Sequence, residues 1–196
     1  TQLSLGKVIG MSSHSNIISS IQLPKPKIEI PKNVTIYSEF GFRKGSVPIT
    51  LWNYIITFYE TIKNNFIPEN NSNNSMLLKN KMKNGTEIAD LPDEIKLRLQ
   101  DIMKEFIEDF VDIVVIPTCS YGIRSYKGGS SLVPHNNDKN TQMFSCLINI
   151  DQKITKPWCF DIKDTNGNWR SIIINPGEYM LYEGCQLEHG RREILT

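Results

Sequence analysis

The spacing of apolar residues changes once along the chain, after Val111. Before that point, two segments carry apolar residues at helical spacing. One runs from Val47, with Pro48 in its first turn, to about Asn65, and the second starts near Leu91. Apolar residues three and four apart line one face of a helix, which can then pack on a core. The pattern therefore predicts two amphipathic helices in the first part of the chain.

After Val111 the apolar residues recur at the spacing of strands. Short segments rich in β-branched and aromatic residues are separated by turn residues, and Asp164–Asn168 contains the Asn-Gly pair typical of hairpins. A succession of eight short strands is typical of a jelly roll. We therefore predict an α+β fold in which a double-stranded β-helix (jelly-roll or cupin-like) core carries packed N-terminal helices. The predicted strands are residues 113–117, 120–126, 131–135, 142–150, 158–163, 169–174, 178–182 and 187–191.

The 196 residues are enough for one well-cored domain and too few for two of full size. Residues 1–45 contain proline-rich stretches that hold the backbone extended, and they predict an N-terminal arm. Residues 46–196 are expected to form a single domain, with a helical part at 46–112 and the jelly-roll core at 113–196. The Asn-rich run at 70–84 predicts a surface loop.

Composition narrows the class of protein. The formal net charge is +1 and aromatic residues make up 9% of the chain, so neither a nucleic-acid-binding surface nor a basic membrane-binding patch is indicated. The chain shows no signal peptide and no apolar run long enough to cross a membrane, and we expect a soluble protein of undefined compartment. Its four cysteines form no CxxC pair, which favours free thiols.

Two histidines provide the candidate chemistry. His135 opens the run His135–Asp138, and His189 lies 54 positions later within Glu188–Arg191, each in a predicted strand. Two imidazoles on neighbouring strands, with an acid two residues after the first, form the facial triad that holds non-haem iron and leaves coordination positions open. Here the residue at that third position is Asn137.

Several short segments, taken in order and spacing, resemble the prolyl 4-hydroxylase-like branch of the Fe(II)/2-oxoglutarate-dependent dioxygenases. The resemblance covers the chain from about Val47 onward and is strongest from Tyr121 to Arg191. The segments are Tyr121-Gly122-Ile123-Arg124-Ser125-Tyr126, Gly129, Leu132, His135, Asn149-Ile150-Asp151, Pro157-Trp158, Pro176-Gly177-Glu178, Leu181-Tyr182-Glu183 and His189-Gly190-Arg191.

This resemblance implies an oxygenase-like domain that binds Fe(II), with His135 and His189 as metal ligands and Asn137 at the family's aspartate position. It implies 2-oxoglutarate as a co-substrate that chelates the metal, and ascorbate as an optional further cofactor. Such enzymes consume oxygen, release succinate and CO2, and hydroxylate an unactivated C–H bond. The implied substrate is a peptide or protein, hydroxylated on a proline or another side chain. The cofactor carries the difficult chemistry and the protein positions it.

The third ligand position departs from the family. Asp138 could be the missing acid only if one residue had been inserted before it. The spacing from His135 to Thr141 is the same as in the family pattern, so replacement of the family's aspartate by Asn137 is the simpler interpretation. Residues two apart on a strand share a face, whereas Asp138 points away unless a bulge turns it. We expect weaker iron binding, because an amide is a poorer ligand than a carboxylate and the site loses one negative charge.

The co-substrate anchor also departs from the family, which places a Lys or Arg on the final strand about ten residues after the distal histidine. This chain ends seven residues after His189, so the anchor lies beyond it or was not retained. Arg191 and Arg192 are the candidate replacements, since a basic side chain pairs with the far carboxylate of 2-oxoglutarate. By family analogy, Tyr126 is a further hydrogen-bond partner for that carboxylate.

Three functional hypotheses remain open at this stage. The leading one, which the resemblance favours, is an active hydroxylase of a peptidyl proline or another peptide side chain. The second is a catalytically impaired descendant of this fold that serves as a structural or binding module in a larger assembly, with the N-terminal arm as the contact to an assembly partner. Asn137 and the missing basic anchor favour the second. The third is an inactive variant in which an acid was changed to Asn137 to trap a complex.

Overall fold

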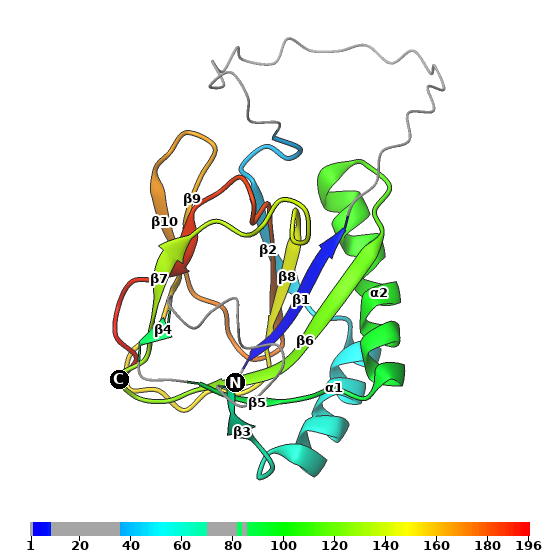
Figure 1. The fold of residues 1–196 in the computed structure, drawn as a ribbon, viewed down its shortest axis with the longest axis vertical. Coiled ribbons are helices and arrows are strands. Elements are labelled where there is room, and N and C mark those ends of the chain that lie inside the picture. The colour runs from blue at the N-terminus through cyan, green and yellow to red at the C-terminus, as the bar shows by residue number, and fades with distance from the viewer. Residues whose placement is uncertain (1, 9–35, 70–81, 84–85) are drawn as a thin grey trace.

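The structure is a computed structural model of the chain, and it describes residues 2–8, 36–69, 82–83 and 86–196. Figure 1 shows two helices lying along one of two β-sheets. All strand pairs are antiparallel. The predicted α+β class is therefore confirmed.

Both predicted helices are present. They are α1 (Ile49–Ile62) and α2 (Asp93–Val111), each preceded by a proline, Pro48 or Pro92, at its N-cap. Proline suits this place because the first N–H groups of a helix have no partner within the helix. Helix α2 ends at Asp112, whose left-handed φ of 54° stops the helix.

The strands of the described residues form a seven-stranded sheet in the order β2-β11-β8-β1-β6-β5-β3 and a five-stranded sheet in the order β10-β9-β12-β7-β4. Their bounds are β1 (Gln2–Val8), β2 (Phe42–Ser46), β3 (Ile67–Pro68), β4 (Met82–Lys83), β5 (Thr86–Ala89), β6 (Pro117–Tyr126), β7 (Ser131–His135), β8 (Ser145–Asn149), β9 (Phe160–Lys163), β10 (Trp169–Ile172), β11 (Glu178–Tyr182) and β12 (His189–Arg191).

Seven of the eight predicted strands have a counterpart, β6 to β12. The segment 113–117 does not form the predicted strand, and only Pro117 belongs to one, as the first residue of β6. The Val115 N–H donates to the Glu108 carboxylate at 2.8 Å. Residues 113–116 therefore serve as the link from α2 into the sheet, although their β-branched side chains alone favour a strand.

The expected arm at residues 1–45 differs most from the structure. Residues 2–8 form β1 in the middle of the seven-stranded sheet. The last residues of the expected arm belong to β2, which is part of the same sheet. Polar and apolar residues alternate in Gln2–Leu5, which indicates a strand. The prediction of an extended arm gave more weight to the proline-rich stretches that follow. Residues 9–35 lie outside the described residues. So does most of the predicted Asn-rich loop, of which Met82–Lys83 form β4.

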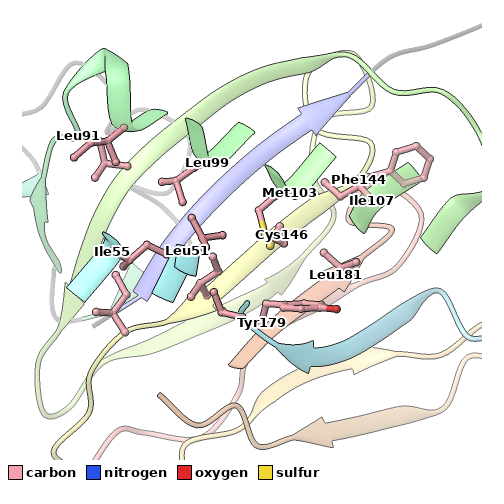
Figure 2. Close-up of a cluster of buried hydrophobic side chains, with 14 of the residues drawn as sticks. Leu51, Ile55, Leu91, Leu99, Met103, Ile107, Phe144, Cys146, Tyr179 and Leu181 are labelled. Carbon is pink, nitrogen blue, oxygen red and sulfur yellow. The ribbon is translucent and has the colours of Figure 1, made fainter. Parts of the chain in front are cut away.

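The seven-stranded sheet packs on both of its faces. Cys146 and Ile148 of β8 belong to the cluster under the helices, whereas Leu147 between them belongs to a second cluster shared with the other sheet. Alternate residues of a strand point to opposite faces, which explains the division. Figure 2 shows the first cluster, where Leu51, Ile55, Leu99 and Met103 of the helices face Cys146, Tyr179 and Leu181. The second cluster contains Leu147, Phe160, Ile162, Ile174, Met180, Tyr182 and Leu187.

A buried carboxylate fastens residues 36–41 to this framework. Glu183 is fully buried and accepts hydrogen bonds from the Tyr37 N–H at 3.1 Å, the Ser38 N–H at 2.8 Å and the Ser38 hydroxyl at 2.7 Å. Burial raises the pKa of Glu183 above its ordinary value of 4.5, although these hydrogen bonds act in the opposite direction.

The raised pKa gives Glu183 a defined effect on stability. Because its folded pKa exceeds its unfolded pKa, its contribution to the free energy of unfolding is complete below the unfolded value and is lost as pH rises through the folded value. Glu183→Gln keeps the shape and cannot titrate. Urea unfolding between about pH 4 and 8 should therefore show a fall in stability that the variant lacks. A difference between the two proteins that is constant with pH would contradict the assignment.

Candidate functional site

The two predicted metal-ligand histidines lie side by side. His135 ends β7 and His189 begins β12, and they are directly opposite each other in the ladder between these strands. Their ring centroids are 4.7 Å apart. Two imidazoles 54 positions apart in the sequence are thus brought within reach of one ion.

Both rings are held in the same way. Nδ1 of His135 lies 2.9 Å from the Val133 carbonyl oxygen, and Nδ1 of His189 lies 2.8 Å from that of Leu187. A carbonyl only accepts, so each Nδ1 carries a proton, and in the neutral form of the imidazole the lone pair is then on Nε2. A hydrogen bond from the other ring nitrogen is the usual support of a metal-binding histidine.

The two rings differ in exposure. His189 is buried, with its ring 4.7 Å from that of Tyr182 and 5.7 Å from that of Phe160, whereas His135 is half-buried. The pair therefore has an aromatic wall on the inner side and opens toward solvent at His135.

Asn137 belongs to the same cluster of side chains. Its Nδ2 donates to the Ser145 hydroxyl at 3.1 Å, and its amide also bonds to the hydroxyl of Tyr182, the ring that contacts His189. A Cβ added to Gly184 would collide with the Asn137 amide, so a larger residue there would displace that amide. Because Nδ2 is engaged with Ser145, Oδ1 is the atom that Asn137 offers as a ligand.

Asp138, the alternative acid, has a different environment. It is exposed, its carboxylate accepts from the Asn140 N–H at 2.8 Å, and its carbonyl accepts from the N–H groups of Thr141 and Gln142. These bonds form the turn that follows β7. The structure therefore groups Asn137, and not Asp138, with Tyr182 beside the histidines.

The donor set suits a weakly held divalent cation. Imidazole nitrogen and amide oxygen both bind transition-metal ions, and neither brings a negative charge. Within the described part of the chain, no three His, Cys, Asp or Glu side chains form a group that could hold a metal. Any ion at the pair would thus depend on the two imidazoles and on the neutral amide of Asn137.

A small pocket of about 70 Å³ contains two of the predicted co-substrate residues, Tyr126 and Arg191. Arg191 is buried, and its guanidinium lies 4.2 Å from the ring centroid of Trp158 and 5.8 Å from that of Tyr126. Its Nη1 donates to the Trp158 carbonyl at 2.6 Å. The pocket is lined by Tyr126, Asn149, Gln152, Lys153, Ile154, Trp158, Ile174, Arg191 and Leu195.

This pocket lies near the histidine pair, although neither histidine lines it. The Arg191 guanidinium lies 6.0 Å from the ring centroid of Phe160, the ring that stacks on His189. One aromatic ring thus separates the imidazole pair from a buried cation. A cation, a phenolic hydroxyl and an amide around a small cavity can bind a carboxylate.

Arg192, the third predicted co-substrate residue, points elsewhere. Its guanidinium lies over the Trp169 ring at 4.4 Å, and its Nε is 3.6 Å from the Asp161 carboxylate. It does not line the pocket. Sequence reasoning missed Lys153 and Asn149 as lining residues, and it did not place Trp158 among the co-substrate residues. Pro157-Trp158 was within the family-like segments, which was the available signal.

The comparisons identify no relative: no family model, no curated protein and no solved structure matches the chain. A search of the described helices found none that is both long and apolar enough to cross a membrane.

Proposed function

We propose that the two sheets form a double-stranded β-helix. The order of the strands supports this, because β6, β8 and β11 lie in one sheet and β7, β9, β10 and β12 in the other. The chain thus passes back and forth between two facing sheets, as in a jelly roll of eight strands. The eighth position, between β6 and β8, is filled by β1.

On this fold we propose an Fe(II)/2-oxoglutarate-dependent dioxygenase of the prolyl 4-hydroxylase type, acting on a peptidyl proline or another peptide side chain. The observation that carries the proposal is the pairing of His135 and His189, with each Nδ1 bonded to a carbonyl. When bound, Fe(II) and 2-oxoglutarate would supply the oxygen chemistry of C–H hydroxylation. Ascorbate belongs to the proposal as an optional reductant.

Different residues of the protein would have separate roles at the site. His135, His189 and the Oδ1 of Asn137 would hold the metal ion. Arg191 would pair with the far carboxylate of 2-oxoglutarate, and the Tyr126 hydroxyl would donate to the same group. Phe160 and Tyr182 would shield His189 from water, which strengthens polar interactions at the site.

The test is a titration of Fe(II), or of Mn(II) as a stand-in, with 2-oxoglutarate present, combined with an assay of succinate release. We expect metal binding in the micromolar range or weaker, with 2-oxoglutarate turnover. His135→Ala should remove both. A chain that binds 2-oxoglutarate without metal and releases no succinate would contradict the enzyme and favour the second candidate.

The second candidate is a non-catalytic binding module of the same fold. Asn137 favours it, because the site then lacks the carboxylate that helps to neutralise a divalent cation. The pocket around Arg191 does not depend on that residue. In this case 2-oxoglutarate or another small carboxylate would bind without metal, and a peptide would bind without being hydroxylated.

The neighbouring arginines offer a matched comparison. Arg191→Met should weaken 2-oxoglutarate binding at least about tenfold, because a charge-assisted hydrogen bond contributes about 1.5–3 kcal/mol. Arg192→Met changes the same side chain on a residue that lies against Trp169, and it should have little effect. Calorimetry with 2-oxoglutarate and Mn(II) measures both. Equal losses would mean that Arg191 does not bind the co-substrate.

A further inference from the structure

Strand β1 occupies an inner position of the seven-stranded sheet, which Figure 1 shows in blue between β6 and β8. It pairs with both neighbours. Gly6 lies opposite Cys119 of β6 and opposite Ser145 of β8. Without β1, the edges of β6 and β8 would face each other with unpaired backbone N–H and C=O groups, the arrangement that attracts another strand.

The strand is joined to the rest of the domain by a long stretch of chain. Residues 9–41 separate Val8 from β2 and are 33 in number. Fully extended, such a stretch reaches at most roughly 110 Å. A compact domain of this length has a radius of gyration of only about 16 Å. The connection is therefore long enough for β1 to reach the slot of its own copy or that of a second copy.

We propose that the slot between β6 and β8 accepts β1 from a second copy of this chain, which gives a reciprocal strand-exchanged dimer. The backbone ladders are the same in both arrangements, so the exchange costs little beyond association. A strand linked to its slot meets it at an effective concentration of at most about millimolar, and this value falls as the linking stretch lengthens. The closed monomer should therefore prevail in dilute solution and the dimer near millimolar protein. This inference does not depend on the proposed enzymatic function.

A second copy is the occupant to which the structure points, because β1 is the strand that fills the slot in the described part of the chain. Its register is defined on both sides, from Gln2 opposite Arg124 and Asn149 to Gly6 opposite Cys119 and Ser145. An unrelated segment would need to satisfy both ladders at once. Every copy of the chain carries the sequence of β1, so a second copy can supply the same strand.

The pairing of Gly6 with Cys119 allows a direct test. Residues opposite each other in an antiparallel ladder have Cα atoms about 4.5–5.5 Å apart, within the range that a disulfide spans. One chain carries Gly6→Cys together with Cys119→Ser, and the other is unsubstituted. A disulfide between the new thiol and Cys119 can then form only between copies.

The two chains are refolded together at about 10 µM and about 1 mM, oxidised, and separated without reductant. We expect a covalent heterodimer whose yield rises about tenfold or more, with residues 6 and 119 linked in its mass spectrum. Ser4→Cys with Cys119→Ser is the matched control, because Ser4 has no cysteine opposite it. Absence of the heterodimer at 1 mM, while Gly6→Cys alone gives a cross-linked monomer, would overturn the proposal.

If Gly6→Cys impairs folding, the unsubstituted chain provides a second measurement. After refolding at about 1 mM and dilution, light scattering should detect a dimer that refolding at about 10 µM does not give. A monomer under both conditions would overturn the proposal.

Discussion

Asn137→Asp is expected to raise the affinity for Fe(II) or Mn(II) at least about 10–100-fold, the range that even outer-shell partners of a metal contribute. The Asn137 amide lies in the cluster with Ser145 and Tyr182 beside His189. A carboxylate of the same shape would add a negative charge opposite the cation. Asn137 now donates to the Ser145 hydroxyl, and the hydroxyls of Ser145 and Tyr182 can reverse direction and donate to a carboxylate in its place, so the exchange should not disturb packing.

Metal titration with and without 2-oxoglutarate measures this change. Asp138→Asn is the matched control, because that carboxylate accepts the Asn140 N–H in the turn after β7 and should not affect metal binding. If Asn137→Asp leaves the affinity unchanged while Asp138→Asn lowers it, the metal site has been assigned to the wrong residue. If succinate release appears only in Asn137→Asp, the natural chain is the binding module.

Glu69→Ala is expected to lower the free energy of unfolding by about 3–5 kcal/mol, the usual cost of leaving one partner of a buried ion pair alone. Both carboxylate oxygens of Glu69 accept hydrogen bonds from Arg124, one from Nε at 2.8 Å and one from Nη2 at 2.5 Å. Both side chains are more than nine-tenths buried. The Thr86 hydroxyl also donates to Glu69. The variant would leave a guanidinium buried beside β5 without this carboxylate.

A second ion pair, between Glu87 of β5 and Lys127 directly after β6, provides the comparison. Lys127 and Glu87 form an exposed ion pair, and Glu87→Ala should cost only about 0–1 kcal/mol. Replacing both buried partners, with Glu69→Gln and Arg124→Met, should cost less than Glu69→Ala alone, because no charge is then left unpaired. Urea unfolding measures all three variants. Equal losses from Glu69→Ala and Glu87→Ala would show that burial does not strengthen this pair.

The pH dependence of this pair has the opposite sign to that of Glu183. Burial raises the pKa of Glu69, but the hydrogen bonds and charge of Arg124 and the Thr86 hydroxyl outweigh it, so the pKa lies below its ordinary 4.5. A lowered folded pKa means that the contribution is present above the unfolded value and is lost as pH falls through the folded value. Glu69→Ala should therefore cost less in acid than at neutral pH.

The local sequence pattern was sufficient to predict much of the fold. The helices have strong apolar periodicity, and β7 and β11 begin and end where the sequence predicts. His135 and His189 could be located because a short motif marks each, and the ladder of β7 with β12 brings them together. Tyr126 and Arg191 were found in the same way, and they line one pocket.

Long-range arrangement could not be predicted in the same way. Residues 2–8 carry only a short alternating pattern, and nothing in it specifies Cys119 and Ser145 as neighbours of Gly6. The different surroundings of Arg191, the last residue of β12, and Arg192, which directly follows it, also depend on tertiary structure. Consecutive residues of an extended backbone point to opposite sides, and only the fold decides which side is buried.

The inner place of β1 also bears on how the protein is made. Ribosomes add about 5–20 residues per second, so roughly 6–24 s pass between the synthesis of Val8 and that of Tyr126, the last residue of its partner β6. Throughout this interval β1 has no complete partner strand to pair with. Slow translation should therefore lengthen the time in which this segment can aggregate, and holdase chaperones should improve the yield.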